Sequence, residues 1–190
     1  MPQPKHVMAL PLPRQPKLDA DTKAYFKLCR EKLGFVPNVL TAYTLRPEKL
    51  KNFMATYNTL MLGDSKLSKL EREMVAVVVS SVNRCYYCLV AHGQAVRRLS
   101  GDPELGEMLA KNYRVATLSK RHRAMLDFAW KLTETPAKID EADRRALIKA
   151  GIKGEEYFDL CDVIAFYNAS NRMATGLDMM PNPEYHQADR

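Results

Sequence analysis

The sequence predicts an all-α protein with a single domain of about eight helices. Apolar residues recur at spacings of three and four along most of the chain, which is the period of an amphipathic helix. Capping residues, prolines and glycines divide this pattern into segments of helix length. No segment keeps the strict alternation that is typical of a half-buried strand. At 190 residues the chain has the length of one domain and can bury a core.

The first 17 residues are predicted to form an extended arm. They contain five of the eleven prolines, which fix φ and donate no backbone hydrogen bond. Four apolar residues favour an arm that packs on the body or on a neighbouring subunit, namely Val7, Met8, Leu10 and Leu12. We expect the helical domain to occupy residues 18–180, followed by a turn-rich, polar tail over residues 181–190.

Capping signals set the helix boundaries. Asp19 or Asp21 caps the first helix, and Gly34 follows as its C-terminal stop. Proline fits the first turn of a helix at Pro47, and again at Pro103. The expected helices cover approximately residues 20–33, 47–62, 69–82, 85–100, 103–113, 120–135, 141–150 and 155–174, with a restart at Asn38.

The helix over residues 69–82 contains the run MVAVVVSSV, whose β-branched residues favour a strand by propensity alone. Ser68 and Glu71, however, form a capping box at its start. The apolar residues before and within the run also keep the three- and four-residue spacing of a helix. We therefore predict a buried helix.

Net charge, hydropathy and cysteine usage indicate where the protein is expected to be located and which partners it is expected to bind. The net charge is +7, but no run of five like charges occurs, which favours a solvated basic surface over nucleic-acid binding. The N-terminal prolines do not resemble a signal peptide, and no apolar run has the roughly 20 residues of a membrane span. The four cysteines do not form a secreted disulfide framework, so we expect a cytoplasmic, reducing location.

The stretch from Glu73 to His92 carries the candidate chemistry. Cys85, Cys88 and His92 lie at spacings of three and four residues, so on a helix they share one face. A thiol in the first turn of a helix has a lowered pKa, and the thiolate is the nucleophile. We expect Cys85 to be the more exposed thiol and to meet a reductant, and His92 to deprotonate Cys88.

Glu73 belongs to the preceding helix. If the two helices pack antiparallel, its carboxylate reaches His92 and orients the imidazole, as in a nucleophile–base–orienter set. The alternative is a surface acid that pairs with Lys69 one turn earlier.

Other interpretations of these residues stay open. Cys85, Cys88 and His92 also supply three ligands for zinc, although a structural zinc site normally has four, and an inert pair is the third alternative. Tyr86 and Tyr87 either line a substrate pocket or pack at a subunit contact. The polar end of the last helix is expected to face solvent, a pocket or an interface being the alternative; it comprises Asn168, Asn171 and Arg172.

The stretch resembles the Glu…Cys-x-x-Cys-x-x-x-His signature of the AhpD-like alkylhydroperoxidases, within the carboxymuconolactone decarboxylase superfamily. The wider chain is similar to the peroxidase-related branch of that family. The residues that carry this likeness are Glu73, FVPN at 35–38, Arg46-Pro47-Glu48 and NRCYYCLVAHG at 83–93.

The resemblance implies an AhpD-like all-α fold and a homo-oligomer, such as a trimer, hexamer or dimer. It implies that Cys85 and Cys88 reduce hydroperoxides by cycling between dithiol and disulfide, that His92 and Glu73 relay protons, and that a dithiol or small thiol restores the pair. Together with the charge pattern, the hydropathy and the missing fourth zinc ligand, this leads us to expect no cofactor, no metal, and no nucleic-acid or membrane partner.

One departure from the family pattern concerns Tyr87, which stands where some active members carry a second histidine. Three functions therefore remain in competition. The first is a dithiol peroxidase, the second a non-enzymatic redox sensor or oligomeric scaffold, and the third a decarboxylase acting on a lactone, which does not need two cysteines.

Overall fold

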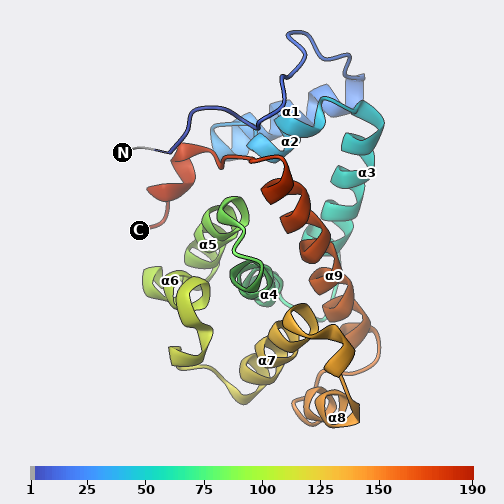
Figure 1. The fold of residues 1–190 in the computed structure, drawn as a ribbon, viewed down its shortest axis with the longest axis vertical. Helices are drawn as coiled ribbons and strands as arrows, with labels where there is room; N and C mark the ends of the chain where they lie inside the picture. Colours follow the sequence, from blue (N-terminus) through green and yellow to red (C-terminus); the bar gives the residue numbers. More distant parts are fainter. Residues whose placement is uncertain (1–2) are drawn as a thin grey trace.

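The computed structural model describes residues 3–190, and within them nine α-helices and no strand. Figure 1 shows their arrangement. The α-helices are α1 (Ala20–Leu33), α2 (Asn38–Tyr43), α3 (Pro47–Tyr57), α4 (Lys69–Val82), α5 (Tyr86–Ser100), α6 (Pro103–Asn112), α7 (Lys120–Glu134), α8 (Glu141–Lys149) and α9 (Glu155–Gly176). A π-helical turn covers Asn58–Leu62, and 3₁₀ turns cover Tyr113–Val115, Pro136–Lys138 and Pro183–His186.

Helix α4 is the centre of the molecule. Its residues 71–80 are all buried, and α5, α6, α7 and α9 pack around it (Figure 1). A helix that is apolar on every side must be covered on every side. This explains the β-branched run: the capping box at Ser68 and Glu71 is present and starts a helix, and the valines fill the core around it.

The capping signals give most of the observed boundaries. The Asp19 carboxylate accepts the Thr22 amide at 2.8 Å, and Gly34 closes α1 in the left-handed conformation at φ 85°. The expected restart at Asn38 is observed as the short helix α2, which brings the described residues to nine α-helices where about eight were expected. Helical structure from Pro47 reaches Leu62 as expected, but its last turn, after Tyr57, is π-helical.

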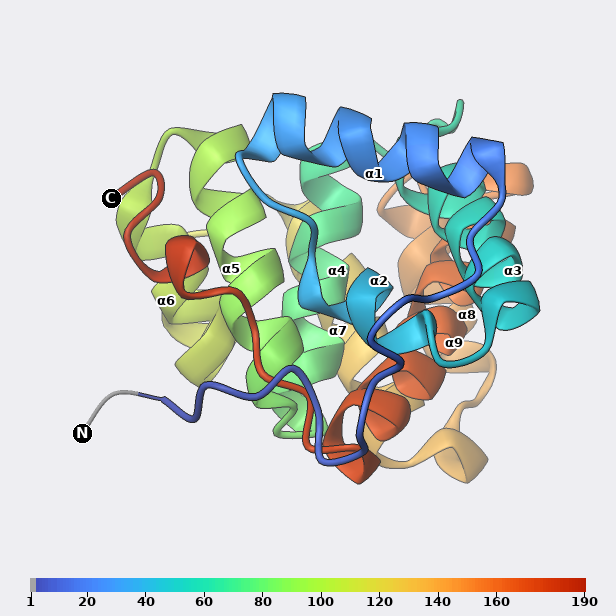
Figure 2. The same ribbon diagram turned by 90° about the horizontal axis from the view of Figure 1, so that it is seen from above.

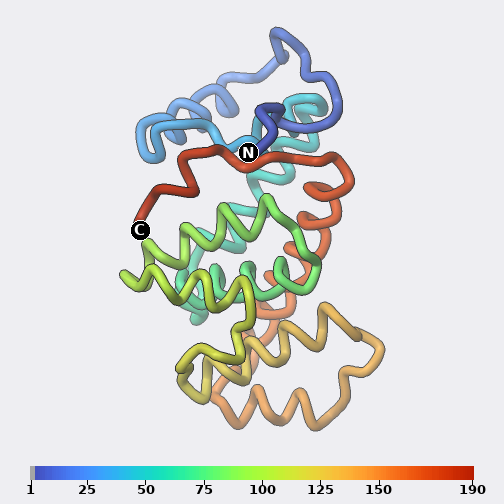
Figure 3. The backbone as a smooth tube through the Cα atoms, turned by 60° about the vertical axis from the view of Figure 1, so that its left-hand side comes forward, coloured from blue at the N-terminus to red at the C-terminus, as the bar shows by residue number. Residues whose placement is uncertain are grey.

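Helices α7 and α8 lie at one end of the molecule, and α1 and the N-terminal segment lie at the opposite end (Figures 1 and 3).

None of the helices described between residues 3 and 190 combines the length and the apolar character needed to cross a bilayer.

The N-terminal arm lies along the C-terminal segment, as Figure 2 shows. The Ala9 amide donates to the Leu177 carbonyl at 2.8 Å, and the Met180 amide donates to the Val7 carbonyl at 3.0 Å. Met8 is only 5% exposed, whereas Leu10 points outward at 44%. The expected packing of the arm is therefore present, except at Leu10; residues 1 and 2 of the predicted arm lie outside the described residues.

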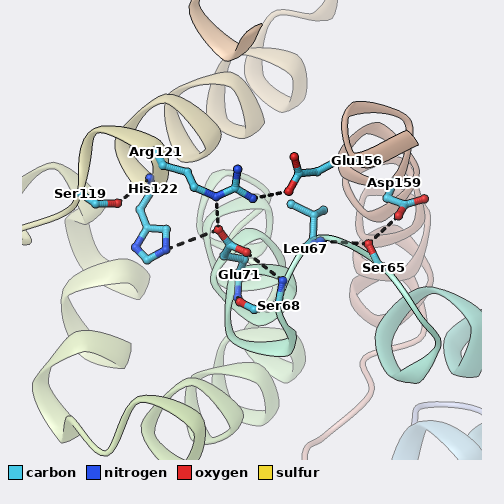
Figure 4. A network of polar contacts seen from close by, with 9 residues as sticks. All are labelled: Ser65, Leu67, Ser68, Glu71, Ser119, Arg121, His122, Glu156 and Asp159. Carbon is cyan, nitrogen blue, oxygen red and sulfur yellow. Dashed lines mark hydrogen bonds and ion pairs between the residues drawn. The ribbon is translucent and has the colours of Figure 1, made fainter. Parts of the chain in front are cut away.

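A cluster of buried charges joins α4 to α7 and α9 (Figure 4). Arg121 of α7 donates from Nε to Glu71 at 2.6 Å and from Nη2 to Glu156. The other oxygen of Glu71 accepts the Ser68 amide at 2.8 Å. Burial opposes ionisation of Glu71, but the hydrogen bonds from Arg121 and Ser68 prevail and hold the pKa of Glu71 below its ordinary value. Both carboxylates are thus compensated by one guanidinium.

Candidate functional site

The turn between α4 and α5 places the first cysteine. The Cys85 amide donates to the Ser80 carbonyl at 3.0 Å, and the Arg84 amide donates to the Ser81 carbonyl at 3.2 Å. This is the hydrogen-bond pattern of a Schellman motif, and Arg84 takes the left-handed position at φ 52° that glycine normally occupies. The turn makes Cys85 the N-cap of α5, with the Leu89 amide donating to its carbonyl at 3.0 Å.

Both thiols of the pair are buried. Cys85 is 1% exposed and Cys88 is 2% exposed, so the expectation that Cys85 is the more exposed thiol is wrong. The cover comes from parts of the chain that are distant in sequence. Met8 of the arm belongs to the same apolar cluster as the two cysteines, together with Ala42, Tyr87, Ala91, Ala174 and Met179.

The two sulfurs are free thiols with different acidities. Hydrogen bonds from the thiol and amide of Cys88, with help from the Thr175 hydroxyl and the nearby His92, outweigh burial and lower the pKa of Cys85 to about 6. The hydrogen bond to Cys85 and burial raise the pKa of Cys88 well above its ordinary value. These shifts favour the thiolate form at Cys85 and the protonated form at Cys88.

His92 and Glu73 form a buried pair between α5 and α4. His92 Nδ1 lies 2.6 Å from Glu73 Oε2, the geometry of an imidazole N–H that donates to a carboxylate. The side chains are 13% and 9% exposed. Helices α4 and α5 pack so that these two residues meet, which was the condition set from the sequence, and among the ion pairs of residues 3–190 Glu73 has none with Lys69. In the described part of the chain Nε2 of His92 has no hydrogen-bond partner, which leaves it available to exchange a proton.

Helix α9 contributes residues that the sequence reasoning did not assign. Tyr167 is 1% exposed, packs edge-on against His92 at 4.7 Å between ring centroids, and places its hydroxyl 3.4 Å from Nδ1. Asn171, one turn later, is also 1% exposed, which corrects the expectation of a solvated face there. Asn168 is half-buried and Arg172 is exposed, so the correction applies most strongly to Asn171. The sequence did contain a signal for this: Tyr167 and Asn171 are four residues apart, so on a helix they share one face.

The two tyrosines between the cysteines have different surroundings. Tyr87 is 4% exposed, and its hydroxyl accepts the Val39 amide at 2.9 Å, near the start of α2. It therefore holds α2 against α5. Tyr86 is 46% exposed and lies beside His186, with 3.3 Å between its hydroxyl and the imidazole Nε2.

The other cysteines lie apart from this site. Cys29 belongs to a separate apolar cluster under α1, and Cys161 is half-buried on α9. Burial raises the pKa of both thiols. Across residues 3–190 no three or more His, Cys, Asp or Glu side chains are grouped so that they could hold a metal ion.

The fold and the site define a class: an all-α protein with an N-cap dithiol backed by a buried histidine–glutamate pair. Comparison with known proteins agrees. The model of the carboxymuconolactone decarboxylase family matches residues 47–116. The crystal structure of an uncharacterized peroxidase-related protein from Silicibacter sp. TM1040 is similar over the whole of both chains, with 57% identity and a TM-score of 0.95.

A second crystal structure, described as an alkylhydroperoxidase AhpD core and uncharacterized peroxidase-related protein from Ralstonia eutropha JMP134, shares 37% identity over 98% of each chain, with a TM-score of 0.93. The chain therefore belongs to the AhpD-like, peroxidase-related branch of the carboxymuconolactone decarboxylase family. The debrominase Bmp8 shares the fold at 19% identity and a TM-score of 0.76, over 96% of this chain and 95% of its own. No functionally curated protein matches the chain.

Proposed function

We propose that the protein is a dithiol peroxidase that reduces hydroperoxides through Cys85 and Cys88. The observation that carries the proposal is the placement of two unjoined thiols, one with a pKa of about 6, next to the buried His92–Glu73 pair. A peroxide-reducing cysteine must be a thiolate at working pH, and a neighbouring thiol must be able to resolve its oxidised form. The peroxidase-related names of the similar structures point in the same direction.

The first step uses the Cys85 thiolate. Its sulfur attacks the distal oxygen of the hydroperoxide, the O–O bond breaks, and the electron pair leaves on the alkoxide. The sulfur is oxidised to a sulfenic acid and the peroxide is reduced to an alcohol once the alkoxide takes a proton. His92 supplies this proton from Nε2, while Glu73 stabilises the charged imidazole through Nδ1.

The second step uses Cys88. Its sulfur attacks the Cys85 sulfenic acid, the S–S bond forms, the S–O bond breaks, and the leaving hydroxide takes up the Cys88 proton to give water. An external dithiol then reduces the disulfide by thiol–disulfide exchange. The reductant and a homo-oligomeric state stay predictions, as does the cytoplasmic location.

Steady-state turnover tests the proposal. We expect the protein to reduce an organic hydroperoxide repeatedly with a dithiol reductant, and Cys85→Ser and Cys88→Ser each to lose at least about 100-fold of this rate. Cys161→Ser is the matched control, because this thiol lies on α9 outside the thiol cluster. Serine variants that turn over like the wild type would exclude the mechanism.

The same experiment separates the competing functions. A redox sensor whose disulfide the reductant does not restore would consume one equivalent of peroxide per dithiol and then stop. A lactone decarboxylase would act on its substrate equally well after both cysteines were replaced. Repeated turnover that depends on both thiols is expected only of the peroxidase.

A further inference from the structure

Asn171 is a buried amide at the thiol site. Its Nδ2 donates to Ser80 Oγ at 3.0 Å, and its Oδ1 accepts from Asn83 Nδ2 at 3.0 Å. Ser80 is fully buried, and its backbone carbonyl also accepts the Cys85 amide. A buried amide costs free energy unless its hydrogen bonds are made, so this cluster is held in one arrangement.

The helix register places Asn171 opposite Cys88. Tyr167 contacts His92, and Asn171 follows Tyr167 by one turn of α9 just as Cys88 precedes His92 by one turn of α5. Further along α9, Ala174 packs in the same cluster as the cysteines. The two helices thus run in opposite directions, and their facing side chains meet turn by turn.

The second hydrogen of Asn171 Nδ2 is free to be donated to the Cys88 sulfur. An amide nitrogen carries two hydrogens, and Ser80 Oγ is the acceptor found for Asn171 Nδ2 among the described residues. The Ser80 hydroxyl uses its own hydrogen on the Ala76 carbonyl at 2.7 Å. Although Cys85 and burial raise the pKa of Cys88, Asn171 and Ser80 act in the opposite direction.

We propose that Asn171 is a positioning residue that donates a hydrogen bond to the Cys88 sulfur and stabilises negative charge on it. This inference rests on the proposed function, in which Cys88 must lose its proton to close the disulfide. The amide of Asn171 helps the buried Cys88 thiol to lose its proton, because the hydrogen bond strengthens as negative charge develops on the sulfur. Asn171 touches neither peroxide nor reductant, so its effect reaches the reaction through Cys88.

A thiolate titration tests the proposal without any peroxide. In Cys85→Ser, the ultraviolet absorbance of the Cys88 thiolate is followed with pH, and a Cys85→Ser/Cys88→Ser protein gives the background of the other two cysteines. We expect Asn171→Ala to raise the pKa of Cys88 by about one unit, the loss of a hydrogen bond to a charged group, which is about a tenfold smaller thiolate fraction at a fixed pH.

Asn168→Ala is the matched control. Asn168 also lies on α9 and also accepts from Asn83 Nδ2, at 3.1 Å, but its own Nδ2 donates to Thr133 Oγ1, and Asn168 is not one of the groups that shift the pKa of Cys88. We expect this variant to leave the titration of Cys88 unchanged. An equal shift in both variants would show a general loosening of α9 and would overturn the proposal.

Asn171→Leu keeps the test decisive if Asn171→Ala does not fold, because leucine fills a similar volume and has no hydrogen to donate. We expect a shift of the same sign and similar size. An unchanged Cys88 titration in folded Asn171→Ala or Asn171→Leu overturns the role of Asn171 and leaves the peroxidase proposal intact. A wild-type protein without turnover, whose Asn171→Ala variant still shows the shifted titration, would overturn the peroxidase proposal and support the hydrogen bond to Cys88.

Discussion

Glu71 and Glu73 are two buried carboxylates on the same helix with different partners. Two residues span about 200° around a helix, so they face opposite sides of α4. Glu71 meets the permanently charged guanidinium of Arg121, with His122 further off at 3.6 Å. Within residues 3–190 Glu73, by contrast, meets the imidazole of His92 alone, a ring that can both give and accept a proton. The first pair is suited to hold helices together, and the second is the one to which we assigned the proton transfer of the proposed reaction.

The difference shows how the type of cation assigns a role to a buried acid. Arg121 bridges Glu71 and Glu156 and so joins α4, α7 and α9 (Figure 4). His92 engages Glu73 through Nδ1, and among the described residues its Nε2 has no hydrogen-bond partner. We therefore expect damage to the first network to appear in stability, and damage to the second in turnover.

The largest expected effect is the loss of stability in Arg121→Ala. Two carboxylates with side chains 7% and 8% exposed would lose their common partner. Breaking a buried pair costs about 3–5 kcal/mol, and we expect a value near 3 because Arg121 is itself 30% exposed. Chemical denaturation measures this, with Arg144→Ala as the control, since Arg144 pairs with Glu141 at the surface. A loss below about 1 kcal/mol would mean that the Arg121 network does not hold the helices together.

Glu73→Gln should lower turnover by about 10- to 100-fold, because the imidazole loses the carboxylate that supports its charged form. The amide keeps the shape of the side chain, so unfolding should change little. Glu71→Gln is the matched control: the same substitution on the opposite face should reduce stability by about 1–2 kcal/mol and leave turnover per folded molecule unchanged. The reverse pattern in the two variants would contradict the assignment.

The pH dependence of Cys85 gives the third test. Its thiolate is present above a pKa of about 6, so its alkylation rate should level off above that pH and fall about tenfold per unit below it. Cys88→Ala removes the largest stabilising hydrogen bond, so the inflection should move up by about one unit. Cys88→Ser keeps a hydroxyl donor and should shift it less. An inflection that stays near 6 in Cys88→Ala would place the cause elsewhere.

Most helix ends and the Glu73–His92 pairing could be predicted from the sequence, because the signals for them are local. Asp19, Ser68 and Gly34 fix helix ends through groups three or four residues away, and these ends are observed. The pairing of Glu73 with His92 followed from two adjacent helices joined by a short turn.

The burial of Cys85 and the role of Asn171 could not be predicted in this way. The thiol lies in an apolar cluster that includes Met8 from the arm, and the amide faces Ser80 from another helix. A polar residue in a helix looks the same in sequence whether it faces solvent or a buried partner. Only the packing of distant segments distinguishes the two cases.

The Arg121 network and the thiol site also differ in what covers them. The Arg121 network lies between helices and is partly open to solvent at Arg121, whereas the thiols share an apolar cluster with an arm that the Ala9 and Met180 amides hold to the C-terminal segment. Met8→Ala should weaken this cover by about 1 kcal/mol and speed thiol labelling about fivefold through local opening. Leu10→Ala, at an exposed position of the same arm, should label like the wild type. Equal labelling of all three proteins would show that reagents reach the thiols by another path.

The smallest expected effect is that of Arg84→Gly, at the end of α4. The start of α4 carries the favourable capping box at Ser68, whereas at its end Arg84 is held in the left-handed region immediately before Cys85. A non-glycine residue is destabilised by roughly 1–2 kcal/mol there, and glycine has a larger unfolded-state entropy, so Arg84→Gly should stabilise the fold by about 0.5–1 kcal/mol. Thermal unfolding measures the gain. Turnover should be unchanged, since Arg84 is exposed to solvent; a loss of turnover in a stabilised protein would show that this strained turn sets the position of the Cys85 sulfur.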